Sequence, residues 1–178
     1  MSQKKKIFAI SGSTRNNSSN FKILKLISEL TKEKFEMKIF EGLSEIPHFN
    51  TDLDTENPPK IVSAFRNEIA EADGILICTP EYIFSLPGSL KNALEWCVST
   101  TIFSQKKVGL ITASASGEKA QEELALIMKT VEAKFSNETE LLIQGVRGKV
   151  NNDGIITDIE TLNKITHFIN SFDKLLNL

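Results

Sequence analysis

The segment from Ile7 to Asn20 is the part of the chain whose residue types most clearly suggest chemistry. A short apolar run, Ile7–Ile10, stops at small hydroxyl and glycine residues and is followed by residues that favour helix starts. A loop that leads into a helix N-terminus offers free backbone N–H groups and a partial positive charge. The neutral side-chain donors of the segment are Ser11, Ser13, Ser18 and Asn20, and Arg15 carries its only full charge. The pattern predicts an anion site, most simply for a nucleotide phosphate, although an ordinary well-capped turn would use similar residues.

The same segment also indicates which kind of phosphate would bind. It matches neither the G-x-x-x-x-G-K-[ST] loop that holds a triphosphate with Mg²⁺ nor the G-x-G-x-x-G loop of dinucleotide sites. No lysine is placed to reach a γ-phosphate. The prediction is therefore a monophosphate that binds without a metal ion.

A second segment, Thr79–Trp96, could hold a planar ring. It contains Tyr82, the only tyrosine of the chain, between Pro80 and Pro87. A rigid, proline-bounded loop with free backbone N–H groups is a suitable shelf for a planar aromatic ligand. The alternative is that Tyr82 and Phe84 simply cover the end of a sheet.

The elements that must position these loops alternate regularly along the chain. Apolar or alternating runs predict strands at 7–10, 35–40, 74–78, 108–112 and 141–143. Helical spacing predicts helices at 20–31, 60–72, 87–98, 119–135 and 158–176. In the first helix the pattern assigns Phe21, Leu24, Ile27 and Leu30 to one face. The longest irregular stretch is Glu41–Pro59.

Inner strands that are apolar on both faces predict an α/β fold with a five-stranded parallel sheet covered by helices on both sides. The run Phe35–Phe40 alternates between apolar and polar residues, which suits an edge strand and the order 2-1-3-4-5. Ligands of such sheets bind beyond the carboxyl ends of the strands, at the switch point between strands 1 and 3. We therefore expect the functional loops to follow Ile10, Cys78 and Thr112.

Composition limits the classes of function. The 178 residues, 40% of them hydrophobic, suit a single domain spanning 1–178. A net charge of −2 and the lack of a basic stripe argue against nucleic-acid binding. No apolar run suggests a membrane span or a signal peptide. Cys78 and Cys97 read as small buried hydrophobes, so we expect a reducing, cytoplasmic setting.

Two long motifs together resemble those of the NADPH-dependent FMN reductase family, which are flavodoxin-like proteins that include quinone, azo-dye and chromate reductases. Residues 12–20 follow G-S-x-R-x-x-S-x-N, and residues 80–96 closely follow P-E-Y-N-x-S-x-P-G-x-L-K-N-A-x-D-W. The motifs occur in the family's order and spacing, and the resemblance spans essentially the whole chain. It implies a flavodoxin-like, FMN-binding fold and an assembly as a homodimer or homotetramer.

The resemblance also assigns roles to particular residues. It implies that the FMN phosphate is held by Ser13, Arg15, Ser18 and Asn20. It implies that the isoalloxazine ring is lined, largely through backbone, by Pro80, Glu81, Tyr82 and Ile83. A third loop would contribute Ser114 and Gly117. The chain departs from the family at Ile83, where asparagine is usual, and at Glu118-Lys119, where a glycine pair is common.

The implied activity is an FMN-dependent NAD(P)H oxidoreductase that passes electrons from NADPH or NADH to a small acceptor such as a flavin, quinone or azo compound. Because the redox chemistry belongs to the cofactor, no catalytic acid–base pair is expected, and none is visible. No metal-ligand cluster is visible either. Of the two histidines, His48 is predicted in a surface loop and His167 as a half-buried packing residue of the last helix.

Two other functions stay open at this point. One is a flavodoxin-type electron carrier that docks a protein partner, although Arg15 and the small net charge count against it. The other is a degenerate, non-enzymatic flavin-binding or regulatory module. Ile83 and the charged third loop keep this second alternative open.

Overall fold

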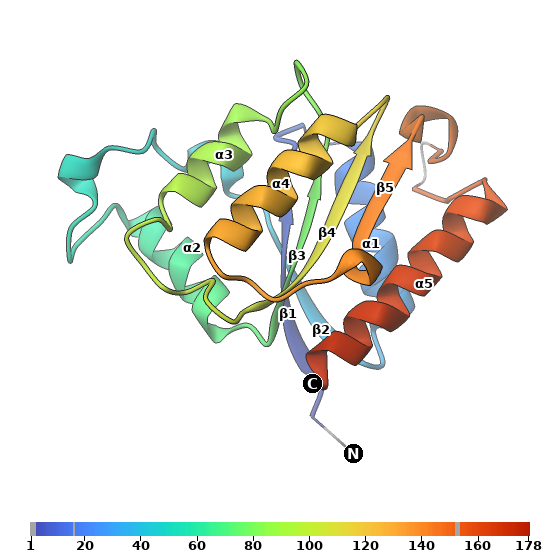
Figure 1. Cartoon of the computed structure of the whole chain (residues 1–178), viewed down its shortest axis with the longest axis horizontal. Coiled ribbons are helices and arrows are strands. Elements are labelled where there is room, and N and C mark those ends of the chain that lie inside the picture. The colour runs from blue at the N-terminus through green and yellow to red at the C-terminus, as the bar shows by residue number, and fades with distance from the viewer. Residues whose placement is uncertain (1–2, 16, 152–153) are drawn as a thin grey trace.

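The computed structural model describes residues 3–15, 17–151 and 154–178. Its centre is a parallel sheet with the strand order β2-β1-β3-β4-β5, as predicted (Figure 1). The strands are β1 (Lys5–Ser11), β2 (Phe35–Phe40), β3 (Gly74–Thr79), β4 (Lys107–Ser114) and β5 (Glu140–Gln144). All six residues of β3 are buried, whereas β2 at the sheet edge keeps exposed and half-buried positions. The hydrophobic pattern therefore distinguishes the central strand from the edge strand correctly.

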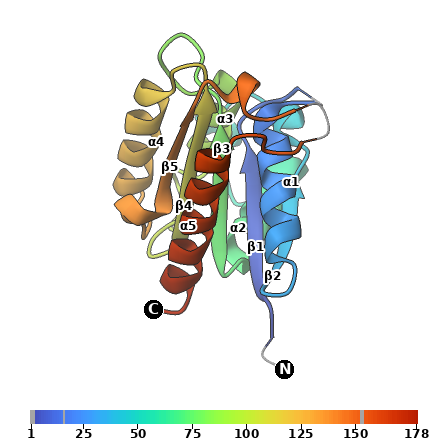
Figure 2. The ribbon, with the colours of Figure 1, turned by 90° about the vertical axis from the view of Figure 1, so that its right-hand side faces the viewer.

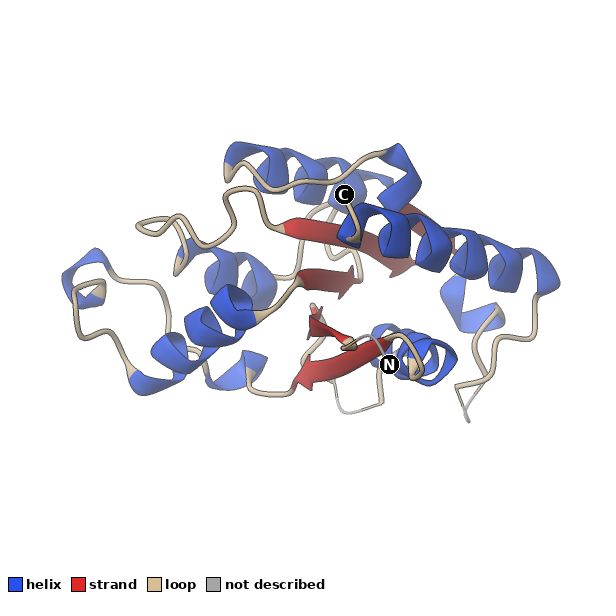
Figure 3. Ribbon diagram, turned by 90° about the horizontal axis from the view of Figure 1, so that it is seen from below, coloured by secondary structure: helices blue, strands red, loops and turns tan. Residues whose placement is uncertain are grey.

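Helices cover both faces of this sheet, so the fold has three layers (Figures 2 and 3). The helices are α1 (Ser19–Thr31), α2 (Lys60–Glu71), α3 (Gly88–Glu95), α4 (Glu118–Thr130) and α5 (Ile159–Leu176). One apolar cluster joins α1 and α5 to the sheet, and a second joins α2, α3 and α4 to the opposite face. This division matters for the site, because the loops that lead to α1 and to α3 leave the sheet edge toward opposite faces.

Helix α4 ends at Thr130, five residues earlier than its apolar pattern predicts. Glu132 adopts a left-handed conformation with a φ of 61°, which stops the helix. The amide of Ala133 donates to the carbonyl of Met128 at 2.9 Å, so the terminal carbonyl is still satisfied. The apolar residues after Thr130 pack as a connecting segment instead.

Leu30 and His167 do not lie where the helical patterns predict. The Leu30 side chain is exposed, because the buried face of α1 runs through Ile23, Leu24 and Ile27. His167 is exposed rather than half-buried, and its Nε2 lies 2.6 Å from an oxygen of Glu138. Its apolar neighbours in sequence point to other sides of α5.

The long segment between β2 and α2 is tied to α3 and to the residue that follows it by half-buried hydrogen bonds. The Asn92 amide donates to the Pro47 carbonyl at 2.9 Å, and the Trp96 indole N–H donates to the same carbonyl at 2.8 Å. Further along, Arg66 pairs with Asp54 at 2.6 Å. Burial alone would raise the pKa of Asp54, but hydrogen bonds and the Arg66 charge outweigh it, so the pKa lies below its usual value.

The two cysteines are free and buried. Burial raises the pKa of both thiols, that of Cys97 to about 12, so both stay protonated at neutral pH. Across the described ranges of the chain, no helix combines the length and apolar character needed to cross a membrane.

Candidate functional site

The loops at the carboxyl ends of the strands enclose a cavity of about 450 Å³. Eight of the ten predicted site residues line it: Ser13, Arg15, Ser18, Asn20, Pro80, Glu81, Tyr82 and Ser114. They come from the loops after β1, β3 and β4, which is where the strand order places a ligand. The size is within the range of small-molecule sites.

The loop between β1 and α1 presents unoccupied donors to the cavity. Ser18 is the N-cap of α1, and its hydroxyl oxygen accepts a hydrogen bond from the Phe21 amide at 3.1 Å. The Ser13 hydroxyl oxygen accepts from the Arg15 amide at 3.4 Å. Each hydroxyl thus keeps its own hydrogen for a ligand, beside the positive end of a helix.

Gly12 lets this loop lie directly against the end of β3. A Cβ on Gly12 would lie 2.4 Å from Oγ1 and 2.8 Å from Cβ of Thr79, too close for any side chain. The Gly12 amide donates to the Cys78 carbonyl at 2.8 Å. The loop is therefore a shaped cradle with neutral donors and one arginine, which fits the phosphate of a mononucleotide.

Asn20 lines the cavity and also holds three elements together. Its side-chain amide donates to the Ala113 carbonyl at 3.2 Å, and its oxygen accepts from the Cys78 thiol at 3.2 Å. The side chain is buried, so it fixes the start of α1 against the ends of β3 and β4. One amide hydrogen is left for a ligand.

Glu81 lines the cavity, but its carboxylate is already hydrogen-bonded to backbone amides of α4 and of the residue before it. One oxygen accepts from the Gly117 amide at 3.2 Å, and the other accepts from the amides of Lys119 and Ala120 at 2.9 and 3.0 Å. Gly117, the N-cap of α4, has no side chain to satisfy these groups. Glu81 therefore caps α4 from a neighbouring loop and holds the loops after β3 and β4 together.

Ile83 and Gly117 are the two predicted site residues that do not line the cavity. Ile83 is at the tip of a two-residue hairpin and is 95% exposed. The hairpin is anchored below by Ser85, whose hydroxyl donates to Glu123 at 2.6 Å. Tyr82, at its base, is about half exposed and faces the cavity.

The charged third loop does not intrude on the cavity either. Glu118 and Lys119 form the exposed first turn of α4 and do not line it. Glu118 accepts from the Gln144 amide at 3.2 Å, and Lys119 pairs with Glu122 at 2.7 Å. The departure from the family pattern at these two positions therefore leaves the cavity open.

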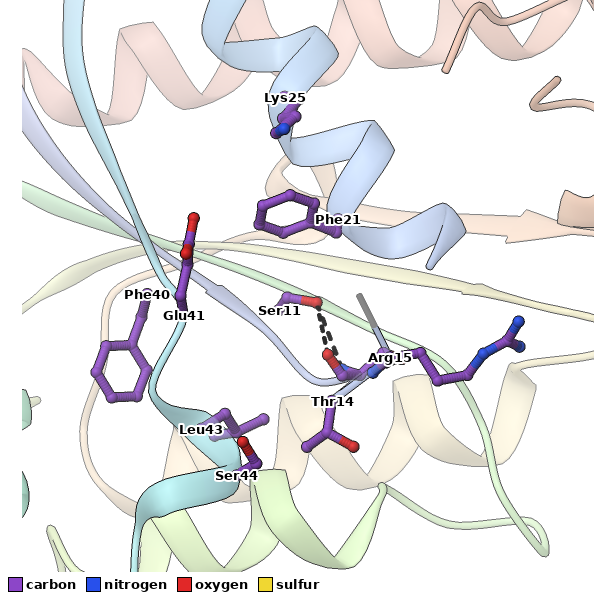
Figure 4. Close-up of a pocket in the computed structure, with 10 residues that line it drawn as sticks. Ser11, Thr14, Arg15, Phe21, Lys25, Phe40, Glu41, Leu43 and Ser44 are labelled. Atoms are coloured by element: carbon purple, nitrogen blue, oxygen red, sulfur yellow. Dashed lines mark hydrogen bonds between the residues drawn. The ribbon is translucent and has the colours of Figure 1, made fainter. Parts of the chain in front are cut away.

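A second hollow of about 260 Å³ also borders the β1–α1 loop (Figure 4). Phe21 and Lys25 of α1 form one wall, with the Lys25 ammonium 4.8 Å from the centre of the Phe21 ring. Arg15 borders both hollows, and Figure 4 shows its guanidinium directed away from the wall made by Phe21. This orientation leaves the Arg15 charge available to the larger cavity.

Arg147 was not found by sequence reasoning, yet it lines the larger cavity. It belongs to η4 (Val146–Gly148), a 3₁₀ turn just after β5. The adjacent glycines, Gly145 and Gly148, mark a turn in the sequence, but nothing there shows that this turn meets the β1–α1 loop. Only the strand order brings the two loops to one cavity.

The fold and the site together define a class of protein. A flavodoxin-like sheet places a loop of anion donors beside a loop that carries Tyr82, which suits a mononucleotide with a large planar ring. Within the described part of the chain, no cluster of three His, Cys, Asp or Glu side chains is placed to hold a metal ion. The class is that of flavin mononucleotide-binding proteins.

Residues 5–147 match the model of the NADPH-dependent FMN reductase family, and the chain belongs to this family. An NAD(P)H:quinone oxidoreductase of Solanum tuberosum is 32% identical over 168 residues, which cover 90% of this chain and 87% of the relative. A quinone reductase of Escherichia coli strain K12 is 28% identical and covers 99% and 97% of the two chains. The structure of FerB, a flavoenzyme NAD(P)H:(acceptor) oxidoreductase from Paracoccus denitrificans, superimposes with a TM-score of 0.86, at 27% identity and over 97% of each chain.

The protein is therefore an FMN-dependent NAD(P)H oxidoreductase. This confirms the family, the cofactor and the class of enzyme that the two motifs predict. The electron carrier and the non-enzymatic module lose their support, since the matching family and relatives are reductases.

Proposed function

We propose that this enzyme reduces quinones with electrons from NADPH or NADH. The acceptor class is carried over from the relatives described above, which are quinone reductases. The observation that carries the proposal is the cavity itself: a phosphate cradle and a half-exposed aromatic shelf meet in one open site of about 450 Å³. An open site of this kind suits a bound flavin that receives two flat reactants in turn.

In this proposal the FMN phosphate is held by Ser13, Arg15 and Ser18, with Asn20 positioning the cradle. The hydroxyl hydrogens of the two serines and the Arg15 guanidinium are the donors. Bound FMN supplies the two-electron redox chemistry, and the protein supplies binding and orientation.

The ring is lined by Pro80, Glu81, Tyr82 and Ser114, largely through their backbone. The Ser114 hydroxyl accepts from the Glu81 amide at 3.2 Å, which joins the two loops at the ring side. Gly117 acts behind this layer, since its amide donates to the Glu81 carboxylate. Ile83 contributes at most its backbone, because its side chain is exposed.

The chain's own residues then orient reactants rather than exchange protons with them. Glu81 is the carboxylate that lines the cavity, and its oxygens already accept three backbone hydrogen bonds. Using it as a base would release the α4 cap. This supports a site without a catalytic side chain.

The proposal extends to the organisation of the protein. We treat 1–178 as one FMN-binding domain that acts as a homodimer or homotetramer in the cytoplasm. Two free, buried cysteines support a reducing compartment. The exposed apolar hairpin tip of Ile83 and Phe84, beside the cavity mouth, supports an assembly of copies.

Anaerobic stopped-flow absorbance tests this function. The FMN-loaded protein is mixed first with NADPH, in a parallel run with NADH, and then with 1,4-benzoquinone. Fast loss of the flavin band with either donor, followed by its recovery on adding the quinone, is the expected result. Reduction without recovery would contradict the quinone assignment, and binding of FMN without reduction by either donor would contradict the reductase activity.

A further inference from the structure

Arg147 is a cation of the cavity to which neither motif assigns a role. It enters the same cavity as Ser13, Arg15 and Ser18, but from the loop between β5 and α5. The two arginines are thus supplied by segments more than a hundred residues apart in sequence. Only the folded chain brings the two arginines to one cavity.

Arg15 and Arg147 have no ion-pair partner among the residues that the structure describes. Among residues 3–15, 17–151 and 154–178, no carboxylate forms an ion pair with Arg15 or Arg147. The carboxylate that lines the cavity, that of Glu81, is committed to three backbone amides. Within the described residues the cavity therefore holds two guanidinium charges without a carboxylate paired to either, which favours a doubly charged anion.

The loop that carries Arg147 packs against α1, the helix that follows the β1–α1 loop. Val146 and Val150 belong to the apolar cluster that also contains Ile23 and Leu24 of α1. The Lys22 ammonium donates to the Asn151 carbonyl at 3.4 Å, again joining α1 to this loop. The ring-side loop after β3 leads instead to α3, on the opposite face of the sheet.

The loop that carries Arg147 is well defined by its own hydrogen bonds. The Gly145 amide donates to the Ala115 carbonyl at 3.1 Å, and the Val150 amide donates to the Val146 carbonyl at 3.1 Å. Gly145 has a φ of 63°, a conformation that glycine adopts without strain. Arg147 is thus presented from a fixed turn, which reduces the entropy lost when its side chain is ordered by a ligand.

We propose that Arg147 and Arg15, from two separate loops that line the cavity, both bind the phosphate monoester of FMN. The inference rests on the proposed function, in which the β1–α1 loop holds this phosphate. A phosphate monoester carries a charge of about −1.5 to −2 at neutral pH, so two cations match it better than one. Guanidinium groups also suit the tetrahedral oxygens, since each can donate two parallel hydrogen bonds.

The test compares FMN with riboflavin, which has the same ring but no phosphate. Dissociation constants for both ligands are measured by quenching of flavin fluorescence for the parent protein, Arg147→Gln, Arg15→Gln and Lys149→Gln. Lys149→Gln is the matched control, because it removes a charge from the same loop outside the cavity lining. Arg147→Gln is expected to raise the dissociation constant of FMN by about tenfold or more and to leave that of riboflavin unchanged.

The remaining outcomes separate this inference from the proposed function. The inference about Arg147 is overturned if Arg147→Gln loses the same affinity for FMN and for riboflavin. It is also overturned if this variant loses no affinity for FMN. An unchanged FMN affinity with a raised KM for NADPH would also overturn it and move the contact to the dinucleotide. If Arg15→Gln loses the preference for FMN and Arg147→Gln keeps it, the phosphate site stands and only the inference about Arg147 fails. If neither variant changes that preference, the phosphate assignment itself fails. Matching circular dichroism spectra and melting temperatures show that each variant is folded.

Discussion

Replacing Ile83 with asparagine tests how the hairpin at the cavity mouth is built. Ile83 and Phe84 occupy its two central positions, with φ values of 51° and 57°. The hairpin is closed by hydrogen bonds between Tyr82 and Ser85, at 3.0 and 3.1 Å. Two-residue hairpins with two positive φ values favour Asn-Gly, and a β-branched residue is among the worst choices there. The loop therefore stores backbone strain at a surface position.

The expected gain follows from the exposure of the side chain. A left-handed conformation costs an L-residue roughly 1–2 kcal/mol, and asparagine avoids part of this cost. Because Ile83 is 95% exposed, almost no apolar burial is lost in exchange. We expect Ile83→Asn to raise the free energy of unfolding by about 1 kcal/mol. For a chain of this size that corresponds to a rise in Tm of about 2–4 °C.

Thermal unfolding followed by circular dichroism measures this change, with Ile83→Val as the matched control. Valine keeps the β-branch and so keeps the strain, and its Tm should stay at the parent value. FMN affinity should not change in either variant, because the side chain does not line the cavity. An Ile83→Asn protein no more stable than Ile83→Val would refute the strain argument. A lower Tm together with dissociation of an oligomer would show instead that the tip is buried between copies.

Three further changes test other parts of the site. Arg15→Ala should weaken FMN binding by about 1.5–3 kcal/mol, the scale of a charged hydrogen bond, in a fluorescence titration. Glu81→Ala should lower the free energy of unfolding by about 1–3 kcal/mol, because it leaves the first amides of α4 without their cap, and denaturant unfolding measures it. Asp54→Asn should lower the free energy of unfolding by about 1.5–3 kcal/mol at pH 7. Since the pKa of Asp54 is lower in the folded protein, its contribution to stability is present above the usual pKa of 3.8 and is lost as the pH falls through the lower folded pKa.

Each of these expectations has a result that contradicts it. If Arg15→Ala binds FMN as tightly as the parent protein does, the proposed contact between Arg15 and the phosphate is wrong. If Glu81→Ala is as stable as the parent and binds flavin equally well, the proposed stabilisation of α4 by the Glu81 carboxylate is wrong. For Asp54→Asn, a stability difference from the parent that does not shrink as the pH falls below 3.8 contradicts the assigned linkage.

Much of the architecture could be predicted from local patterns. The burial of β3 on both faces and the alternation of β2 are visible in the sequence because side chains of a strand point to alternate faces. The edge position of β2 and the strand order follow from that contrast. Helix ends were less predictable. Helix α4 stops after Thr130 because Glu132 is left-handed, and the sequence has no glycine there that would indicate such a conformation.

The sequence by itself determined the β1–α1 loop proposed to hold the phosphate, since Gly12, Ser13, Arg15 and Ser18 lie within one short segment whose shape depends on local backbone geometry. It also pointed to Tyr82 beside the cavity. Only the tertiary structure decided that Ile83 is exposed, because neighbouring residues in a tight hairpin can point in opposite directions.

The partners of Glu81 and of Arg147 were also decided only by the tertiary structure. Glu81 reaches amides about forty residues further along the chain, and Arg147 meets a loop at the opposite end of the sequence. Such contacts depend on which strands are neighbours and on which face each helix packs. A sequence motif describes the residues of a single loop. The net charge that lines a cavity built from four loops depends on which loops the sheet brings together.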